Sequence, residues 1–181
     1  MNKLFWGFFL LFLNFHLSFN ANTLQLLPDW LGFILLYLAC AELRSESELF
    51  GKPQPFCIGL AIYDATFWLL DFLAINVQLG ILGWALRLAA LCLRLYVTLL
   101  VVKAIANMEM RRNADLGSAW LRRVWTVLAA ASIAACLLTL IPALAILGAI
   151  TAGIAGIVFL VAVHKTRKAY RQMLSDYRQD F

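Results

Sequence analysis

The stretch that decides the fold reads FCIGLAIYDATFWLLDFLAIN at residues 56–76 and, after a short link, ILGWALRLAALCLRLYVTLLVVK at residues 81–103. Each segment holds about the 20 apolar residues that a transmembrane helix needs. Each also carries two charged residues inside its apolar run, although a charge in hydrocarbon costs at least ~2.5–3.5 kcal/mol. We therefore expect an antiparallel helical hairpin whose opposite charges face one another.

The four charges share one spacing. Asp64 and Asp71 lie seven residues apart in the first segment, and Arg87 and Arg94 lie seven apart in the second. Facing residues of an antiparallel hairpin have position numbers with a constant sum. That sum is 158 both for Asp71 with Arg87 and for Asp64 with Arg94. Because seven residues is about two helical turns, like charges also share a helix face. The spacing predicts two intramembrane charge pairs, which either hold the helices in register or line the path of a solute.

The composition indicates the class of protein. The chain of 181 residues is 64% hydrophobic, has a mean hydropathy of +0.84 and contains 14% charged residues, whereas soluble domains hold about 25%. The apolar residues form long runs rather than alternating patterns, which favours helices over a transmembrane barrel. The sequence predicts an all-α polytopic membrane protein, a single transmembrane domain with six transmembrane helices arranged as three helical hairpins. The expected spans are residues 4–19, 28–43, 56–76, 81–103, 123–140 and 144–164.

The basic residues predict the orientation in the membrane. Of fifteen Lys and Arg, Arg87 and Arg94 lie inside a span. With six spans the other thirteen all fall on one side, and the opposite links, 20–28, 76–80 and 141–143, hold none. The positive-inside rule then places both termini in the cytoplasm. The net charge of +5 reflects this topology and an attraction to the lipid bilayer, not nucleic-acid binding.

The first segment begins like a secretory signal peptide, because Lys3 is followed by the apolar run 4–13. However, Phe19-Asn20-Ala21 puts a bulky residue where a cleavage site needs a small one. Removal of the segment would also leave an odd number of spans and scatter the basic residues over both sides. We therefore expect the segment to remain as the first span.

No pattern in the sequence indicates a catalytic, cofactor or metal site. The sequence has no HExxH motif, no phosphate-binding glycine loop and no nucleophile with a complete catalytic set. The four cysteines form no CxxC pair and fall in or beside apolar spans, where free thiols pack as small hydrophobes. They are Cys40, Cys57, Cys92 and Cys136. These observations favour a protein that is not an enzyme.

Small residues mark the last two spans. Gly148, Ala152 and Gly156 recur every four residues, a spacing that lets helix backbones approach closely in lipid. The pattern predicts a tight hairpin that turns at Pro142, and its alternative is a face that docks another membrane subunit. The tail, residues 165–181, is amphipathic and is expected to lie along the cytoplasmic membrane surface, with docking onto a cytoplasmic protein as the alternative.

The run LLPDWLGF at residues 26–33 has the chemistry of a helix start, with Pro28 in the first turn and the acid Asp29 facing the positive end of the helix dipole. This run, Phe5-Trp6-Gly7, and the later Lys52-x-x-Pro55-Phe56 with Ala61-x-Tyr63 resemble a family of small integral membrane proteins of Gram-positive bacteria. The resemblance covers mainly residues 1–76. It implies a bacterial cell membrane and no particular activity.

Two kinds of function are open. In the first, the protein is a structural or partner-binding membrane subunit, and the charges only keep the helices in register. In the second, it binds or moves a small solute along the charged residues. The size and six spans resemble substrate-binding subunits of energy-coupling-factor vitamin transporters. The first segment, 4–19, is however rich in Phe and Leu and lacks the alanine pattern by which those subunits dock their transport partner.

Overall fold

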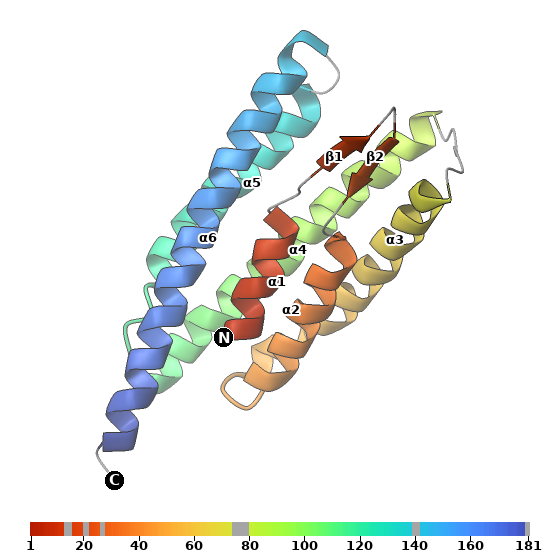
Figure 1. Ribbon diagram of the computed structural model, residues 1–181. Coiled ribbons are helices and arrows are strands. Elements are labelled where there is room, and N and C mark those ends of the chain that lie inside the picture. The colour runs from red at the N-terminus through yellow and green to blue at the C-terminus, as the bar shows by residue number, and fades with distance from the viewer. Residues whose placement is uncertain (13–15, 20–21, 26–27, 74–79, 139–141, 180–181) are drawn as a thin grey trace.

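The structure is a computed structural model (Figure 1), and it describes residues 1–181 except 13–15, 20–21, 26–27, 74–79, 139–141 and 180–181. Within the described residues the chain forms six α-helices, one short 3-10 helix and one two-stranded sheet. In chain order they are α1 (Asn2–Phe12), β1 (His16–Phe19), β2 (Asn22–Gln25), α2 (Asp29–Leu43), η1 (Glu48–Gly51), α3 (Gln54–Phe72), α4 (Gly80–Arg112), α5 (Ser118–Leu138) and α6 (Pro142–Gln179).

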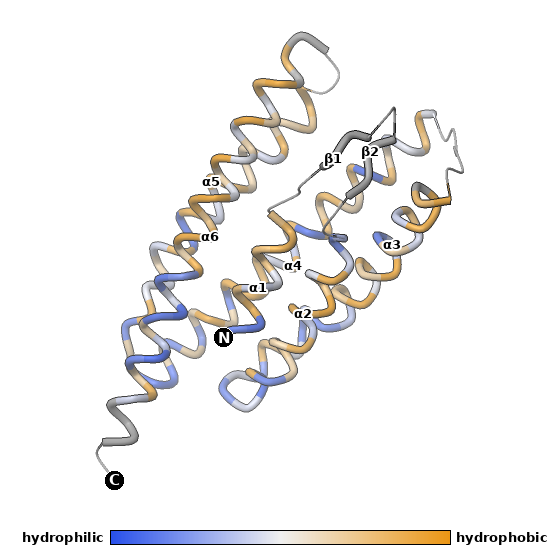
Figure 2. Tube along the Cα trace, viewed as in Figure 1, coloured by the Kyte–Doolittle hydropathy of each residue, from blue (hydrophilic) through white to orange (hydrophobic). Residues whose placement is uncertain are grey.

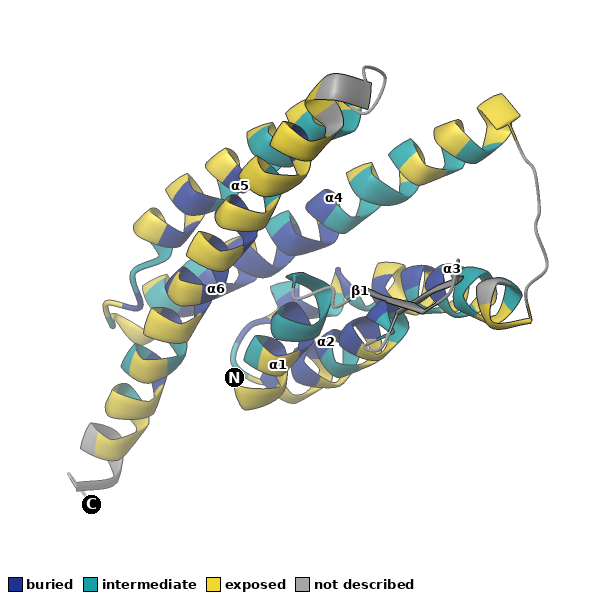
Figure 3. Cartoon of the chain, turned by 45° about the horizontal axis from the view of Figure 1, so that its top comes forward, coloured by how far each residue is buried: buried dark blue, intermediate teal, exposed yellow. Residues whose placement is uncertain are grey.

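Helix α4 lies between two groups of helices (Figures 1 and 3). On one side α5 and α6 pack along each other, and on the other side α2 packs against both α1 and α3. Helix α4 contacts α5 and α3, and α1 also contacts α6. The buried core draws on both groups, with Phe8 from α1, Phe33 from α2, Val101 from α4 and Phe159 from α6. The Phe8 and Phe159 rings meet edge to face with centroids 5.2 Å apart.

Hydrophilic residues gather at one end of the molecule. Figure 2 shows them at the end where both termini lie, while the rest of the long helices is mostly hydrophobic. This end also holds two ion pairs, between Lys3 Nζ and Glu42 Oε2 at 3.1 Å and between Arg112 Nη2 and Glu46 Oε2 at 2.8 Å. Their side chains are partly exposed, so each pair contributes little stability. The arrangement gives the molecule one polar end, which is typical of the part of a membrane protein that lies at the membrane surface.

Three helices are long and apolar enough to cross a membrane. They are α4, α5 and the part Ile146–Ser175 of α6. Helix α1, with 11 residues, and α2, with 15, are shorter than the ~20 residues of a membrane-spanning helix. The predicted helical fold is thus confirmed, whereas six spans in three hairpins are not. Helices α4 and α6 also continue past their predicted spans, so the basic link after residue 103 and the tail after residue 164 are helical over most of their length.

The first predicted span differs from the structure. A helix was expected over residues 4–19, but α1 ends at Phe12 and residues 16–19 form strand β1. This strand pairs with β2 in antiparallel register, from His16 with Gln25 to Phe19 with Asn22. Polar and apolar residues alternate in His16-Leu17-Ser18-Phe19, and period-2 alternation is typical of a strand. Because the segment as a whole is apolar, the change from helical to two-residue periodicity was not recognised and the strand was not predicted.

Helices α1 and α2 approach each other closely at two glycines. A Cβ atom on Gly7 would lie 3.0 Å from the carbonyl oxygen of Gly32, and a Cβ on Gly32 would lie 2.9 Å from the carbonyl oxygen of Gly7. Each would also meet a leucine side chain, Leu36 at 2.9 Å or Leu11 at 2.8 Å. Such distances leave no room for a side chain. The crossing therefore requires glycine at both positions, and it sets where α2 begins relative to α1.

Candidate functional site

Asp64 and Arg94, the inner pair of the predicted hairpin, lie against each other. Helix α3 carries Asp64, helix α4 carries Arg94, and the guanidinium Nη2 lies 2.6 Å from Asp64 Oδ1. At this distance Arg94 donates a hydrogen bond to the carboxylate as well as pairing with its charge. Charge-assisted hydrogen bonds of this kind are about twice as strong as neutral ones. The pair fixes the register of α3 against α4.

A third charged residue, Asp29, joins this pair. The Asp29 Oδ2 atom lies 3.2 Å from Arg94 Nη1, so Arg94 uses one terminal nitrogen for each of two carboxylates. Asp29 is the first residue of α2, after Pro28, whose extended backbone (φ −70°, ψ 127°) precedes the helix. The predicted helix start is therefore observed. The acid at that start serves a second purpose that the sequence reasoning missed, since it brings α2 to the α3–α4 hairpin.

The cluster of Asp29, Asp64 and Arg94 is largely buried. The side chains of Asp29 and Asp64 are only 6% and 8% exposed, and that of Arg94 is 33% exposed. Arg94 also lies over the ring of Phe33 with its Cζ 5.7 Å from the ring centroid, a cation–π contact. When all three groups are ionised, two carboxylates and one guanidinium leave a net charge of −1. Counted by themselves, these three groups are thus one positive charge short of neutral.

Several polar atoms at the cluster have no hydrogen-bond partner among the described residues. They are Asp64 Oδ2, Arg94 Nε and, beside Asp29, the indole Nε1 of Trp30. Trp30 also contacts Trp68, which lies one helical turn after Asp64, with ring centroids 6.4 Å apart. Buried polar atoms without partners are costly. Asp64 Oδ2 can bind a cation or accept a hydrogen bond, whereas Arg94 Nε and Trp30 Nε1 are N–H donors that need an acceptor such as water. The cluster therefore combines a missing positive charge with unused hydrogen-bonding capacity.

The outer predicted pair, Asp71 with Arg87, stays a prediction. Asp71 lies in α3, but its side chain is outside the described part of the structure. Arg87 is exposed on α4 and forms no ion pair with a described residue. The turn between the two helices falls in the undescribed residues 74–79 as well.

The predicted small-residue stripe on α6 divides between two neighbours. A Cβ on Gly148 would lie 3.0 Å from the Ala135 Cα of α5, so this glycine does permit a close approach of α5 and α6. A Cβ on Gly156 would instead lie 3.2 Å from Phe12 of α1. Ala152 is half-buried between these positions, and the predicted turn before Pro142 lies outside the described residues. The stripe therefore serves two helix contacts rather than one.

The fold and the cluster define a helical protein with three helices suited to a membrane and a buried, charge-unbalanced site where three helices meet. Within the described residues there is no group of three or more His, Cys, Asp or Glu that could hold a metal ion. Comparison of the chain with protein-family models, curated proteins and solved structures finds no match.

Proposed function

We propose that the chain is a multi-pass protein of the bacterial cell membrane that binds a small cation at the cluster of Asp29, Asp64 and Arg94. The observation that carries the proposal is that two buried carboxylates share one guanidinium. An unbalanced charge in a low-dielectric interior is costly unless another group neutralises it. A bound cation, of which a proton is the smallest, supplies the missing positive charge. This is a binding role, with no catalytic step.

The place of the cluster along α4 supports this proposal. Arg94 lies nine residues before Lys103, roughly 14 Å along the helix at ~1.5 Å per residue. If Lys103 marks the cytoplasmic edge of a hydrocarbon core ~30 Å thick, the cluster lies near its middle. Helix α2 begins at that depth, and strands β1 and β2 precede it. In membrane proteins, non-helical backbone at such depth is tolerated only inside protein or along a water-filled cavity, and solute sites of transporters are often built at broken helices.

The aromatic neighbours of the cluster also favour a cation. Trp30 follows Asp29, Trp68 lies one turn after Asp64, and the two indoles are in contact. The faces of aromatic rings attract cations, tryptophan most strongly. The combination of carboxylates and indoles suits an alkali ion, a proton or a small organic ammonium ion, all of which carry one positive charge.

A structural role is the second candidate, and one observation favours it. Arg94 reaches a carboxylate on α2 and another on α3, so it ties three helices together. In that case the protein would be a structural or partner-binding membrane subunit. We prefer the cation-binding role to the structural role because the three groups of the cluster carry a net charge of −1 when ionised.

The two candidates predict different responses to cations. If the cluster binds a cation, one of the conditions tested should raise the unfolding temperature of the full chain in detergent above that in the others. The conditions are Na⁺, K⁺, ammonium, choline and acid, all at equal ionic strength. A ligand at 100 times its Kd stabilises by about 2.7 kcal/mol. Asp64→Asn should abolish that response but still fold, because Asp29 and Arg94 remain as a balanced pair. If the wild type and Asp64→Asn respond identically to every cation and to pH, the cluster is only structural.

The topology is tested separately. Both termini are proposed to be cytoplasmic because the thirteen basic residues outside or at the ends of the predicted spans fall on one side of a six-span arrangement. Reporter fusions after Lys52, Arg112 and Phe181 should therefore report the cytoplasm, and a fusion after Leu79 the opposite side. An external signal from the Arg112 fusion would contradict the orientation. A split between the Arg112 and Phe181 fusions would instead contradict the number of spans.

A further inference from the structure

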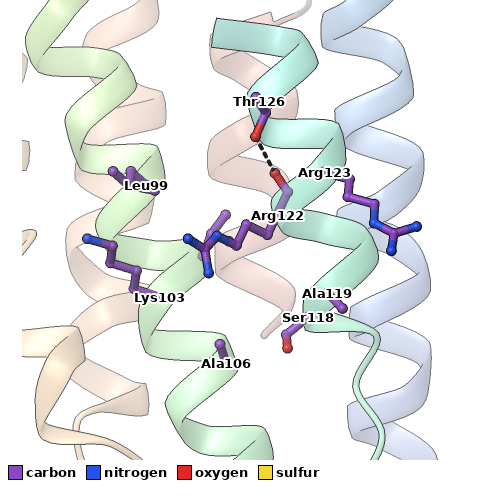
Figure 4. Close-up of a pocket in the computed structure, with 9 residues that line it drawn as sticks. Leu99, Lys103, Ala106, Ser118, Ala119, Arg122, Arg123 and Thr126 are labelled. Atoms are coloured by element: carbon purple, nitrogen blue, oxygen red, sulfur yellow. Dashed lines mark hydrogen bonds between the residues drawn. The ribbon is translucent and has the colours of Figure 1, made fainter.

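A basic pocket lies between α4 and α5, away from the ionic cluster. It has a volume of about 430 Å³ and is open to the surface. Three cations line it, together with the hydroxyls of Ser118 and Thr126; the cations are Lys103, Arg122 and Arg123. Figure 4 shows Arg122 extending from α5 toward α4, while Arg123 extends to the other side of α5. Arg122 is therefore the charge that faces the space between the helices, whereas Lys103 lines the pocket from α4 with its ammonium group turned away from α5 and must swing its flexible stem round to join Arg122.

No carboxylate neutralises these two cations. Within the described part of the chain, neither Lys103 nor Arg122 takes part in an ion pair. Thr126 donates its hydroxyl hydrogen to the Arg122 carbonyl oxygen at 3.1 Å, which leaves its oxygen able to accept only. The first amide of α5 is already occupied, since Glu109 accepts from the Ser118 amide at 2.9 Å. The charge that attracts an anion to the pocket is thus that of its basic side chains.

The pocket lies where a membrane surface is expected. Lys103 ends the fourth predicted span, and Arg122 lies in the second turn of α5, just before the fifth span begins at residue 123. Trp120 is exposed nearby, and Trp125 donates its indole hydrogen to Thr98 of α4 at 3.0 Å. Tryptophan is enriched at membrane surfaces, at the level of the lipid headgroups. Basic pockets between helices at that level on the cytoplasmic side bind anionic headgroups.

We propose that this pocket binds a phosphate group of single negative charge, with Arg122 and Lys103 as its ligands and the Ser118 hydroxyl as a further donor. The Arg122 guanidinium offers two parallel N–H groups that match two phosphate oxygens, and Lys103 adds a compact positive charge. A phosphate diester of an anionic lipid such as phosphatidylglycerol and a soluble phosphate share this chemistry. The site is separate from the cation site and does not depend on it.

Binding to the full chain in detergent tests the proposal. The probes are short-chain phosphatidylglycerol, phosphatidylcholine of equal chain length and inorganic phosphate, and the readout is a titration of the tryptophan fluorescence. Phosphatidylglycerol should bind the wild type more tightly than phosphatidylcholine. Lys103→Gln with Arg122→Gln should weaken that binding roughly 30-fold, since each cation near a membrane surface contributes about a fivefold attraction. Arg122→Gln alone should weaken phosphatidylglycerol binding about fivefold. This single variant tests the proposal if the double variant does not fold.

Arg111→Gln is the matched control. Arg111 is exposed at the same end of α4 but does not line the pocket, and its loss removes the same charge. Its effect on binding should stay within twofold. If inorganic phosphate binds as tightly as the lipid and is lost in the same variants, the phosphate site stands and its source is soluble. Equal binding of both lipids without any binding of phosphate, or equal losses in Arg111→Gln and Arg122→Gln, would overturn the proposal.

Discussion

Replacement of Arg94 by leucine should destabilise the chain by about 3–5 kcal/mol, the cost of leaving buried charges without a partner. Arg94 is the common partner of Asp29 and Asp64, whose side chains are almost fully buried. Its loss leaves two carboxylates close together with no positive charge between them. Unfolding of the purified chain, followed by tryptophan fluorescence in a denaturing detergent, measures the effect. The folded yield should fall in parallel.

Removal of the carboxylates should rescue the Arg94 variant. In Arg94→Leu with Asp29→Asn and Asp64→Asn no buried charge remains, so this triple variant should be more stable than Arg94→Leu alone. Asp64→Asn by itself should cost less than Arg94→Leu, because the remaining aspartate and arginine balance each other. If the three single effects simply add in the triple variant, the side chains do not interact in the folded protein.

The Arg94 cluster also shows how far the sequence could predict the site. Within one hairpin of adjacent segments, a constant sum of position numbers placed Asp64 opposite Arg94, and these side chains are in contact. Asp29 belongs to a segment that is not adjacent to α4 in the chain, so no register relates it to Arg94. The clue that could have found it is the acid itself. Asp29 lies in an otherwise apolar stretch, where a charge needs a partner of opposite charge. Its role at the helix start does not remove that need.

The sequence predicted the long helices and also α2, expected over 28–43 and observed over Asp29–Leu43, but not the strands between α1 and α2. Helices α4, α5 and α6 follow from runs of apolar residues that are long enough to cross a membrane. Helices α1 and α2 are too short for that rule, and the strands between them depend on a local alternation of four residues. The crossing of α1 and α2 depends on Gly7 and Gly32, which lie in two different segments. Only the three-dimensional contact shows that these glycines act together.

This contact leads to the second prediction. Gly32→Ala should destabilise the chain by about 1–3 kcal/mol, as overpacking does in other well-packed sites. The added Cβ would lie 2.9 Å from the Gly7 carbonyl oxygen and 2.8 Å from the Leu11 Cγ. The leucine end can rotate away, but the backbone oxygen cannot. The helices must therefore separate, which would also move Asp29, one turn before Gly32, away from Arg94.

Gly59→Ala is the matched control, because Gly59 lies in α3 with nothing within 4 Å of its added Cβ. Alanine is the better helix former, so this variant should be unchanged or more stable by up to about 1 kcal/mol. Thermal unfolding of both variants in one detergent measures the difference, and Gly7→Ala should resemble Gly32→Ala. Equal stability of Gly32→Ala and Gly59→Ala would mean that α1 and α2 do not touch at these glycines. Because the crossing is also expected to hold Asp29 near Arg94, Gly32→Ala and Gly7→Ala should in addition weaken the cation response of the cluster of Asp29, Asp64 and Arg94, and Gly59→Ala should not.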